Sequence, residues 1–350
     1  MKHIFIQTSG RSERKQVHRQ FLLLGFALLL VSGVFALSFT LQNSTIEFGQ
    51  SITSQTIPEL VTSNMIYNID ANSNTSYSGS GYTWKDISGN GNDFVVPGGS
   101  SPGSTQAPTT YQFNGTTTSP NGTCTAPTFS SSTQPKYFVF TRTATSGSNS
   151  PTGTCFQGLN SWLSGKNFTV AAWIKTTQVG GGYAHYKYMA IVACEYGGVN
   201  GDWSFGIDSA GNLAFGTGGT ASGKNDLSFS TSTLVNTGSW VYVAVTRTYA
   251  SSGTGYGVVT FYVNGSKVAT NACYLAGGTT STSCTSTTVK NAQNANGNSI
   301  VGTNTYLEIG TEDDSPGYSF GGDIGAEYGW NQVMTDSQIL QNYNASKSQY

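Results

Sequence analysis

The sequence is poor in charged side chains and in histidine, and these shortages argue against several classes of protein. Lys, Arg, Asp and Glu make up 9% of the 350 residues, and histidine occurs three times. His3 and His18 precede the longest apolar run, so His185 stands alone in the rest of the chain, with no G-x-S-x-G turn. A Ser-His-Asp hydrolase site is therefore not indicated.

Basic side chains are concentrated at the start of the chain and are scarce elsewhere. Lys2, Arg11, Arg14, Lys15 and Arg19 precede residue 21, and the remaining chain is mildly acidic without a basic stripe. Binding to the phosphate backbone of a nucleic acid requires clustered positive charge. We therefore expect no nucleic-acid partner.

None of the five cysteines has the C-x-x-C spacing of a zinc site. Cys124 and Cys155 lie in one polar stretch and Cys273 and Cys284 in another, so local pairing predicts two disulfides that staple these loops. Sequence alone does not determine the connectivity. Cys194 ends the apolar segment MAIVAC, which predicts a buried thiol.

The residues that are abundant indicate β-structure. The 44 glycines suit turns, and 37% hydrophobic and 12% aromatic residues are enough to fill a core. Residues 259–263 alternate as VTFYV, the Asn264-Gly265 pair suits a type I′ turn, and residues 266–270 return as a second strand. Residues 240–248 alternate as well. Antiparallel strands with one apolar face each imply a sheet packed on another sheet.

Residues 21–41 form an uncharged apolar run that follows the basic residues 1–20. A helix of this length spans a hydrocarbon core of about 30 Å, and the preceding positive charge directs the rest of the chain out of the cytosol. Two alternatives stay open: a cleaved signal peptide with Val34-Phe35-Ala36 before the cleavage point, or a retained membrane anchor. Residues 42–64 are expected to be a linker, and the body is expected to be extracellular or at the cell surface.

The body contains a series of segments in a characteristic order. They are residues 65–70 (MIYNID), 76–93 (SYSGSGYTWKDISGNGND), 167–175 (NFTVAAWIK), 306–310 (YLEIG), 320–330 (FGGDIGAEYGW) and 334–343 (MTDSQILQNY). Together they resemble laminin G-like, concanavalin A-type domains of bacterial surface and phage structural proteins. The resemblance implies one all-β domain over residues 65–350, an antiparallel jelly-roll sandwich with a short C-terminal helix. Residues 98–164 and 272–301 would be insertions.

The string WKDISGNGND over residues 84–93 has a structural interpretation of its own. Trp84 is expected to cover an edge of the core. Asp86 and Ser88 can tie the turn through side-chain-to-backbone hydrogen bonds, and Gly89 and Gly91 permit left-handed backbone conformations.

The C-terminal helix is also predicted without the resemblance. Thr335 at the N-cap and Gln338 three positions later form a capping box. Ile339, Leu340 and Tyr343 follow at helical spacing and predict an apolar side.

Laminin G-like domains often bind one Ca²⁺ at the rim of the sandwich, so the resemblance implies calcium as a possible cofactor. Carboxylate oxygens on adaptable loops suit this ion. The candidate ligands are Asp93, Asp202, Glu312, Asp313 and Asp314. The alternative is that these acids form solvated turns.

A carbohydrate site requires exposed aromatic faces beside planar polar side chains, and residues 180–203 have this composition. The aromatic candidates are Tyr183, Tyr186, Tyr188, Tyr196 and Trp203. Asn200 and Asp202 can hydrogen-bond sugar hydroxyls. The alternative is that alternate tyrosines belong to strand faces.

The resemblance also includes glycoside hydrolases, some of which carry acids as E-x-D-x-x-E on one strand. In this chain Glu308 is followed at the second acid position by Gly310, and Asp323 and Glu327 lie on a closing strand. A same-face pair of carboxylates is therefore missing, and we expect no enzyme. The sequence favours an exported, non-catalytic module that binds a glycan or a surface protein. A self-assembling structural surface or virion protein is the alternative, and a glycoside hydrolase is a weaker one.

Overall fold

A computed structural model describes residues 35–41, 44–50, 58–97, 111–113, 116–118, 124–131, 134–142, 154–159, 167–183, 185–194, 203–217, 226–248, 258–276, 306–311 and 318–350. The chain divides into two compact units, Met1–Thr56 and Ile57–Tyr350.

In the first unit, β1 (Phe35–Leu41) pairs antiparallel with β2 (Ser44–Gln50). The helix predicted over residues 21–41 is therefore wrong for its last seven residues, and residues 21–34 lie outside the described part. The hairpin contains the β-branched and aromatic residues Phe35, Phe39, Thr40, Thr45, Ile46 and Phe48, which favour extended backbone. Within the described ranges, no helix has the length and apolarity needed to cross a bilayer.

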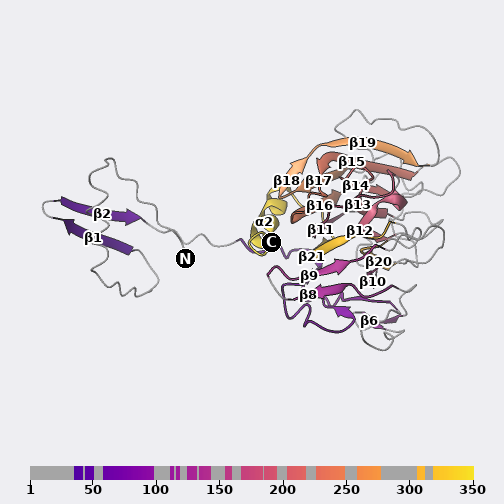
Figure 1. Cartoon of the computed structure of the whole chain (residues 1–350), viewed down its shortest axis with the longest axis horizontal. Helices are drawn as coiled ribbons and strands as arrows, with labels where there is room; N and C mark the ends of the chain where they lie inside the picture. Colours follow the sequence, from indigo (N-terminus) through magenta and orange to yellow (C-terminus); the bar gives the residue numbers. More distant parts are fainter. Residues whose placement is uncertain are drawn as a thin grey trace. The chain divides into compact units, whose positions relative to one another are not determined.

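The second unit contains a nine-stranded antiparallel sheet (Figure 1). Its strands, in spatial order, are β19 (Thr270–Ala276), β15 (Asp226–Leu234), β14 (Asn212–Thr217), β13 (Trp203–Ile207), β12 (Met189–Cys194), β20 (Tyr306–Ile309), β10 (Phe156–Leu159), β5 (Phe94–Val95) and β4 (Thr83–Trp84). A short 3-10 helix, η2 (His185–Lys187), contacts β13, β14 and β15. A separate two-stranded hairpin joins β6 (Tyr111–Phe113) and β7 (Thr116–Thr118).

An eight-stranded antiparallel sheet forms the other layer. Its order is β18 (Ser266–Val268), β17 (Val259–Val263), β16 (Val241–Arg247), β11 (Phe168–Lys175), β21 (Gly322–Trp330), β9 (Tyr137–Phe140) and β8 (Thr128–Ser130), with β3 (Met65–Asp70) paired to β21. Two packed antiparallel sheets with one C-terminal helix confirm the predicted β-sandwich, and the arrangement is consistent with a jelly roll.

The main core lies between the sheets and is built from alternate residues of the central strands. Val243 and Val245 of β16 face Phe205 and Phe215 of the opposite sheet within one buried cluster. Trp84 belongs to this cluster, is fully buried, and packs its ring 4.6 Å from that of Phe138. The predicted role of Trp84 as a core residue is confirmed.

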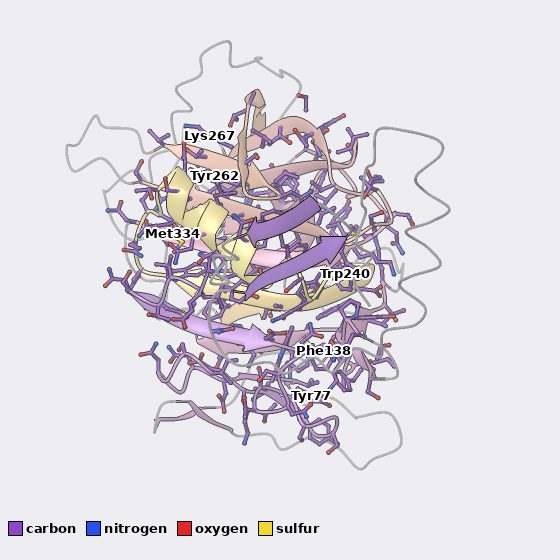
Figure 2. All side chains as sticks on the ribbon, turned by 90° about the vertical axis from the view of Figure 1, so that its left-hand side faces the viewer. Tyr77, Phe138, Trp240, Tyr262, Lys267 and Met334 are labelled. Carbon is purple, nitrogen blue, oxygen red and sulfur yellow. A yellow bond between two sulfur atoms is a disulfide. The ribbon has the colours of Figure 1, made fainter. Side chains whose placement is uncertain are left out.

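The second face of the eight-stranded sheet is also buried over its central strands, because the C-terminal helix lies on it. α2 (Asp336–Ser346) covers a cluster that includes Trp173, Tyr242, Tyr262, Tyr328 and Trp330. Figure 2 shows α2 lying across the strands with Tyr262 and Met334 beside it. The sequence predicted one apolar face for these strands, whereas both faces are buried.

The capping box of α2 is confirmed in both directions. The Gln338 backbone N–H donates to Thr335 Oγ1 at 3.3 Å, and the Thr335 backbone N–H donates to Gln338 Oε1 at 2.9 Å. Ile339 is buried, but Leu340 is 45% exposed. The buried stripe of the helix therefore passes through Ile339, Asn342 and Ser346 rather than Leu340.

Residues 58–64 of the predicted linker belong to the second unit and pack against its C-terminal helix and β21. The Val61 N–H donates to Asn342 Oδ1 at 2.8 Å, and the indole N–H of Trp330 donates to the Val61 carbonyl at 2.8 Å. Leu60 and Val61 join the cluster beneath α2. This part of the linker is therefore a structural element of the sandwich.

The turn after Trp84 is organised by one carboxylate. Asp86 Oδ1 accepts from the N–H groups of Asn68 and Ser88, and Oδ2 accepts from the Asn92 N–H and the Ser88 hydroxyl, at 2.8–3.0 Å. Gly89 and Gly91 have positive φ of 93° and 70°. The structure confirms the turn predicted from these residues.

One of the two predicted disulfides lies in the described residues and is present, between Cys124 and Cys155. The backbone of Cys273 is in β19, but its side chain and all of Cys284 lie outside the described part, so that pairing stays a prediction. Cys194 is a fully buried thiol at the end of β12, as predicted.

The turn between β17 and β18 generates a stability prediction. Asn264 and Gly265 both have positive φ, 50° and 78°, as a type I′ turn requires. A Cβ at Gly265 would lie 3.0 Å from Tyr343 of α2, whereas a Cβ at Gly89, also at positive φ, would meet nothing within 4 Å. Left-handed backbone costs an alanine roughly 1–2 kcal/mol.

We therefore expect Gly265→Ala to lower the free energy of unfolding by more than Gly89→Ala, because only the first substitution also displaces α2. Chemical denaturation of both variants measures the difference. Equal losses for the two variants would show that α2 is not seated tightly on the turn.

Candidate functional site

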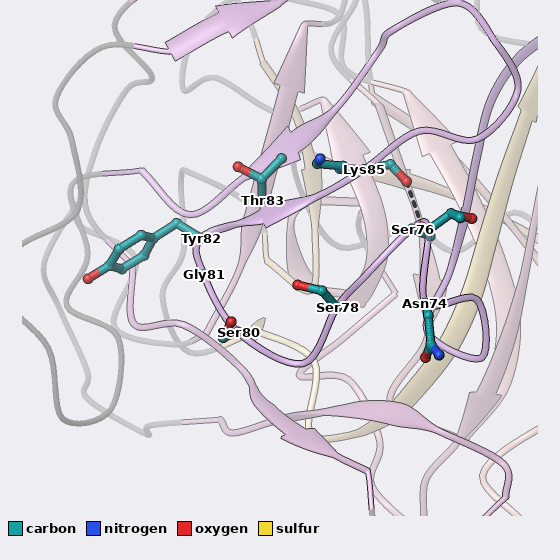
Figure 3. Close-up of a pocket in the computed structure, with 9 residues that line it drawn as sticks. Asn74, Ser76, Ser78, Ser80, Gly81, Tyr82, Thr83 and Lys85 are labelled. Carbon is teal, nitrogen blue, oxygen red and sulfur yellow. Dashed lines mark hydrogen bonds between the residues drawn. The ribbon is translucent and has the colours of Figure 1, made fainter.

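The second unit contains an open polar pocket between β3 and β4, with a volume of about 220 Å³. All of its lining residues come from one stretch of chain: Asn74, Thr75, Ser76, Ser78, Ser80, Gly81, Tyr82, Thr83 and Lys85. Figure 3 shows these residues around a single loop, with the Tyr82 ring directed away from the others. The pocket wall is therefore made of hydroxyl, amide and ammonium groups.

Hydrogen bonds at the base of the loop fix its two ends. Ser76 is fully buried; its hydroxyl accepts from the Asp70 N–H at 3.1 Å and donates to the Lys85 carbonyl at 2.5 Å (Figure 3). The Lys85 N–H donates to the Ser76 carbonyl at 2.8 Å. Ser76 and Lys85 are thus joined to each other, and this pairing closes the loop between them.

Tyr77 packs between the loop and the aromatic core. Its hydroxyl donates to the Gly81 carbonyl at 3.1 Å, and its ring packs 4.8 Å from that of Phe129 and 4.7 Å from that of Phe138. Gly79 and Gly81 both have a φ of 100°, a conformation that favours glycine. These contacts hold the small polar residues between Tyr77 and Tyr82 at the surface.

Several polar groups of the lining are available to a ligand. The hydroxyls of Ser78, Ser80 and Thr83 and the ammonium of Lys85 make no hydrogen bond or ion pair with any described residue. Asn74 Oδ1 accepts from the Lys136 ammonium at 2.7 Å. Within the lining there is no carboxylate, so the pocket offers mainly hydrogen-bond donors and hydroxyls.

The sequence predictions missed this pocket. The string SYSGSG was interpreted only as part of the family resemblance. A signal was nevertheless present, because serine alternates with Tyr77, Gly79 and Gly81 from Ser76 to Ser80. Small hydroxyl residues separated by glycine cannot fill a core, so such a run indicates an exposed polar loop.

The predicted aromatic candidates fall into different environments. Tyr183 is 40% exposed and Tyr186, within η2, is half-buried, and both belong to the connection between β11 and β12 at the rim of the sandwich. Tyr188 and Trp203 are fully buried, and the Trp203 ring packs 5.2 Å from that of Phe168 in the core. Neither buried ring presents a face to a ligand. Tyr196, Asn200 and Asp202 lie outside the described residues.

One cationic side chain lies beside the rim tyrosine Tyr186, and another lies beside Tyr318. The Lys187 ammonium lies 5.5 Å from the centroid of the Tyr186 ring. The Arg142 guanidinium donates to the Val179 carbonyl at 2.7 Å and lies 6.0 Å from the Tyr318 ring, which packs on Gly181. Partial burial lowers the pKa of Arg142.

Of the five predicted calcium ligands, only Asp93 lies in the described residues. Its Oδ1 accepts from the Asp86 N–H at 2.9 Å, and burial raises its pKa. Asp202, Glu312, Asp313 and Asp314 are outside the described part. Among the residues that the structure describes, no group of three or more His, Cys, Asp or Glu side chains is placed to hold a metal ion, so the calcium site stays a prediction.

Comparison with known families now adds to this geometry. A laminin G family model described as "Concanavalin A-like lectin/glucanases superfamily" matches residues 152–340, just over half of the chain. The chain belongs to this superfamily.

Solved structures with similar backbones include the binding domain of Paraclostridial Mosquitocidal Protein 1, at 13% identity and a TM-score of 0.46, covering 81% of this chain and 52% of that one. The binding domain of Botulinum neurotoxin DC in complex with rat synaptotagmin II is 14% identical, with a TM-score of 0.43 and the same coverage.

Domain 4 of AbnA, an extracellular arabinanase from Geobacillus stearothermophilus, in complex with arabinotriose, is 14% identical, with a TM-score of 0.44, and is matched over 98% of its length and 80% of this chain. The chain spans about half the length of the two toxin chains. Comparison with curated protein sequences gives no match.

Because the superfamily includes glucanases, the placement of the buried acids is informative. Leu307 and Ile309 of β20 face the core, so Glu308 between them projects from the opposite face of the nine-stranded sheet, where Gln157 donates a hydrogen bond to it. Gly310 has a φ of 83°, and a Cβ there would lie 2.2 Å from the Phe140 ring, on the core side. The position two residues after Glu308 therefore cannot present an acid beside it.

Glu327 is separated from Glu308 by the nine-stranded sheet. Its neighbours Ala326 and Tyr328 face α2, so Glu327 projects into the space between the sheets, fully buried, and accepts from the Tyr67 hydroxyl at 3.1 Å. Burial raises the pKa of Glu327 well above its usual range, and the Tyr67 hydrogen bond offsets this only partly. The carboxyl therefore stays protonated at pH values at which an exposed glutamate has lost its proton.

This burial makes stability depend on pH. In the unfolded chain the Glu327 carboxyl loses its proton near the ordinary pKa of 4.5, whereas the folded chain retains it to higher pH. The unfolded state then binds fewer protons, so the free energy of unfolding falls as pH rises from about 4.5 towards the folded pKa. Glu327→Gln keeps an acceptor for Tyr67 and removes the ionisable group.

We expect Glu327→Gln to raise Tm at pH 7 and to flatten the decline of Tm between pH 5 and pH 8. Thermal melting across this range tests it. Asp323→Asn is the control and should change the slope less, because Lys175, 3.3 Å away, partly offsets the rise in the pKa of that half-buried carboxyl. A pH profile as steep in Glu327→Gln as in the unaltered chain would contradict the assignment.

Proposed function

We propose that this chain is an exported, non-catalytic surface module that binds a glycan through the polar pocket of residues 74–85. The observation that carries the proposal is the wall of the pocket, where three hydroxyls and one ammonium have no partner among the described residues. A sugar ring presents several hydroxyls in fixed directions, and a pocket of this kind matches them with directional hydrogen bonds.

Membership of a lectin and glucanase superfamily supports a saccharide as the ligand. The disulfide between Cys124 and Cys155 and the uncharged run of residues 21–41 behind a basic segment support export. In this proposal the apolar run that begins at residue 21 directs export. The glycan chain of a glycosylated surface protein could bind in the same pocket.

The arrangement of acids supports binding without hydrolysis. Retaining glycosidases need two carboxyl groups about 5 Å apart on one face, and inverting enzymes need them roughly 6.5–9.5 Å apart. Glu308 and Glu327 lie on different sheets and point into different spaces, and Glu327 is sealed in the core. A bound glycan at the pocket would meet neither of them.

Binding of the full chain to a glycan array tests the proposal. The triple variant Ser78→Ala, Ser80→Ala and Thr83→Val removes three pocket hydroxyls while retaining the glycines and the length of the loop. We expect it to lose at least tenfold in affinity for the best-bound glycan. The matched control removes three exposed hydroxyls elsewhere, through Ser63→Ala, Ser266→Ala and Ser348→Ala, and should bind as the unaltered chain does.

A second pair of measurements separates the pocket from the other predicted sites. Tyr183→Ala with Tyr186→Ala removes the rim rings, and EGTA removes calcium. If either treatment abolished binding while the pocket variant bound normally, the ligand site would lie at the rim or at a metal, and the pocket assignment would be wrong. A chain that bound no glycan at all would contradict the proposed function itself.

A further inference from the structure

The pocket of residues 74–85 is bordered by two lysines. Lys85 is exposed, belongs to the lining, and makes no ion pair within the described residues. Lys136 lies at the edge of the pocket, where its ammonium donates to Asn74 Oδ1 at 2.7 Å. That bond also sets the orientation of the Asn74 amide, so its NH₂ group remains a donor for a ligand.

The acidic residues next to the pocket in sequence direct their oxygens elsewhere. Asp70 Oδ1 accepts from the Asn72 N–H and from the Tyr350 hydroxyl. Both oxygens of Asp86 accept hydrogen bonds within its own turn, and Asp93 accepts from the Asp86 N–H. These carboxylates hydrogen-bond within the scaffold and none belongs to the pocket lining, although the Lys85 ammonium lies near enough to Asp93 to act against the rise in its pKa. Lys85 is therefore the charged residue of the lining.

The backbone of the loop adds further donors. Gly79 and Gly81 have a φ of 100°, and they alternate with Ser78 and Ser80, which do not have positive φ. The N–H groups of residues 78–81 make no hydrogen bond to any described residue. Backbone N–H groups that the fold leaves unpaired on a surface loop are donors that an anionic group can accept.

We propose that the pocket selects an anionic saccharide unit, one whose ring carries a carboxylate or a sulfate group. The acidic group lies among the backbone N–H groups of residues 78–81 and the Lys85 ammonium, and the ring hydroxyls contact Ser78, Ser80, Thr83 and Asn74. This inference rests on the proposed glycan-binding function and adds the class of sugar. Charge-assisted hydrogen bonds are about twice as strong as neutral ones, so the acidic group dominates the preference.

Matched pairs of oligosaccharides test the preference. Isothermal titration of the full chain compares an oligogalacturonate with its carboxyl-reduced form, and a sulfated chondroitin oligosaccharide with its desulfated form. We expect at least one anionic member to bind tenfold or more tightly than its matched partner, with an affinity that falls as salt rises. The galacturonate pair reports carboxylate recognition, and the chondroitin pair reports sulfate recognition.

Variants at Lys85 then test the contact itself. Lys85→Gln should lose about tenfold in affinity for the preferred anionic sugar and little for its partner, whereas Lys85→Arg should retain binding. Lys267→Gln is the matched control, because Lys267 is an exposed lysine on β18, outside the pocket lining, and is labelled beside α2 in Figure 2.

The backbone contribution is tested by a pair of glycine variants. Gly81→Ala and Gly89→Ala share a positive φ and an open Cβ direction, so their effects on folding should be similar. Only Gly81→Ala alters the pocket, and it should weaken binding of the anionic sugar. Melting curves confirm that both variants are folded.

Equal binding of the anionic and neutral members of both pairs, with Lys85→Gln behaving like Lys267→Gln, would overturn the inference and leave the glycan-binding proposal intact. Binding to no saccharide of either kind would overturn the proposed function. The two failures are therefore distinguishable in one set of titrations.

Discussion

The structure depends on β21, which is buried on both faces. Ile324 points into the core between the sheets, while Ala326, Tyr328 and Trp330 point towards α2 and residues 60–61. The strand pairs with β11, β9 and β3, so it connects segments from the beginning, the middle and the end of the second unit. The amphipathic helix and the apolar outer face require each other, because neither would be stable exposed to water.

The position of the pocket follows from this strand. β3 pairs with β21, and the Ala71 N–H continues the ladder by donating to the Gly325 carbonyl at 2.9 Å. Tyr350 packs its ring against Gly325 and hydrogen-bonds Asp70, so the chain beyond β3 is held in place. Asp70 in turn donates its N–H to Ser76, the buried residue from which the pocket loop begins.

Features whose causes are local in sequence could be predicted. The Asn264-Gly265 turn, the capping box of Thr335 and Gln338 and the turn around Asp86 each depend on residues within a few positions of one another. The two-layer sandwich could be predicted from the alternation of apolar and polar residues, because a strand with one apolar face must pack that face on another layer.

Features that depend on long-range pairing could not be predicted in the same way. Tyr262 is on the face opposite Phe261, and it is buried only because α2, more than seventy residues later, lies over it. Trp203 was expected at a ligand site. The pairing of β13 with β12 instead places the Trp203 side chain in the core and the Ser204 side chain on the opposite face of the sheet. A period of two determines which residues share a face but does not determine which face is covered.

The same burial explains why the ligand site is assigned to a loop. Over its central strands, the face of the eight-stranded sheet opposite the core is covered by α2. On the corresponding face of the nine-stranded sheet, Ala193, Ser204 and Ala214 of the central strands are fully buried as well. A ligand therefore has access to the connections between strands rather than to these buried parts of the sheet faces.

The loop of residues 74–85 combines a rigid attachment at Ser76 and Lys85 with hydroxyl, amide NH₂ and ammonium groups that make no hydrogen bond to the rest of the described fold. A rigid base with unused donors is what selective binding of a polar ligand requires, because little ordering of the loop then opposes association.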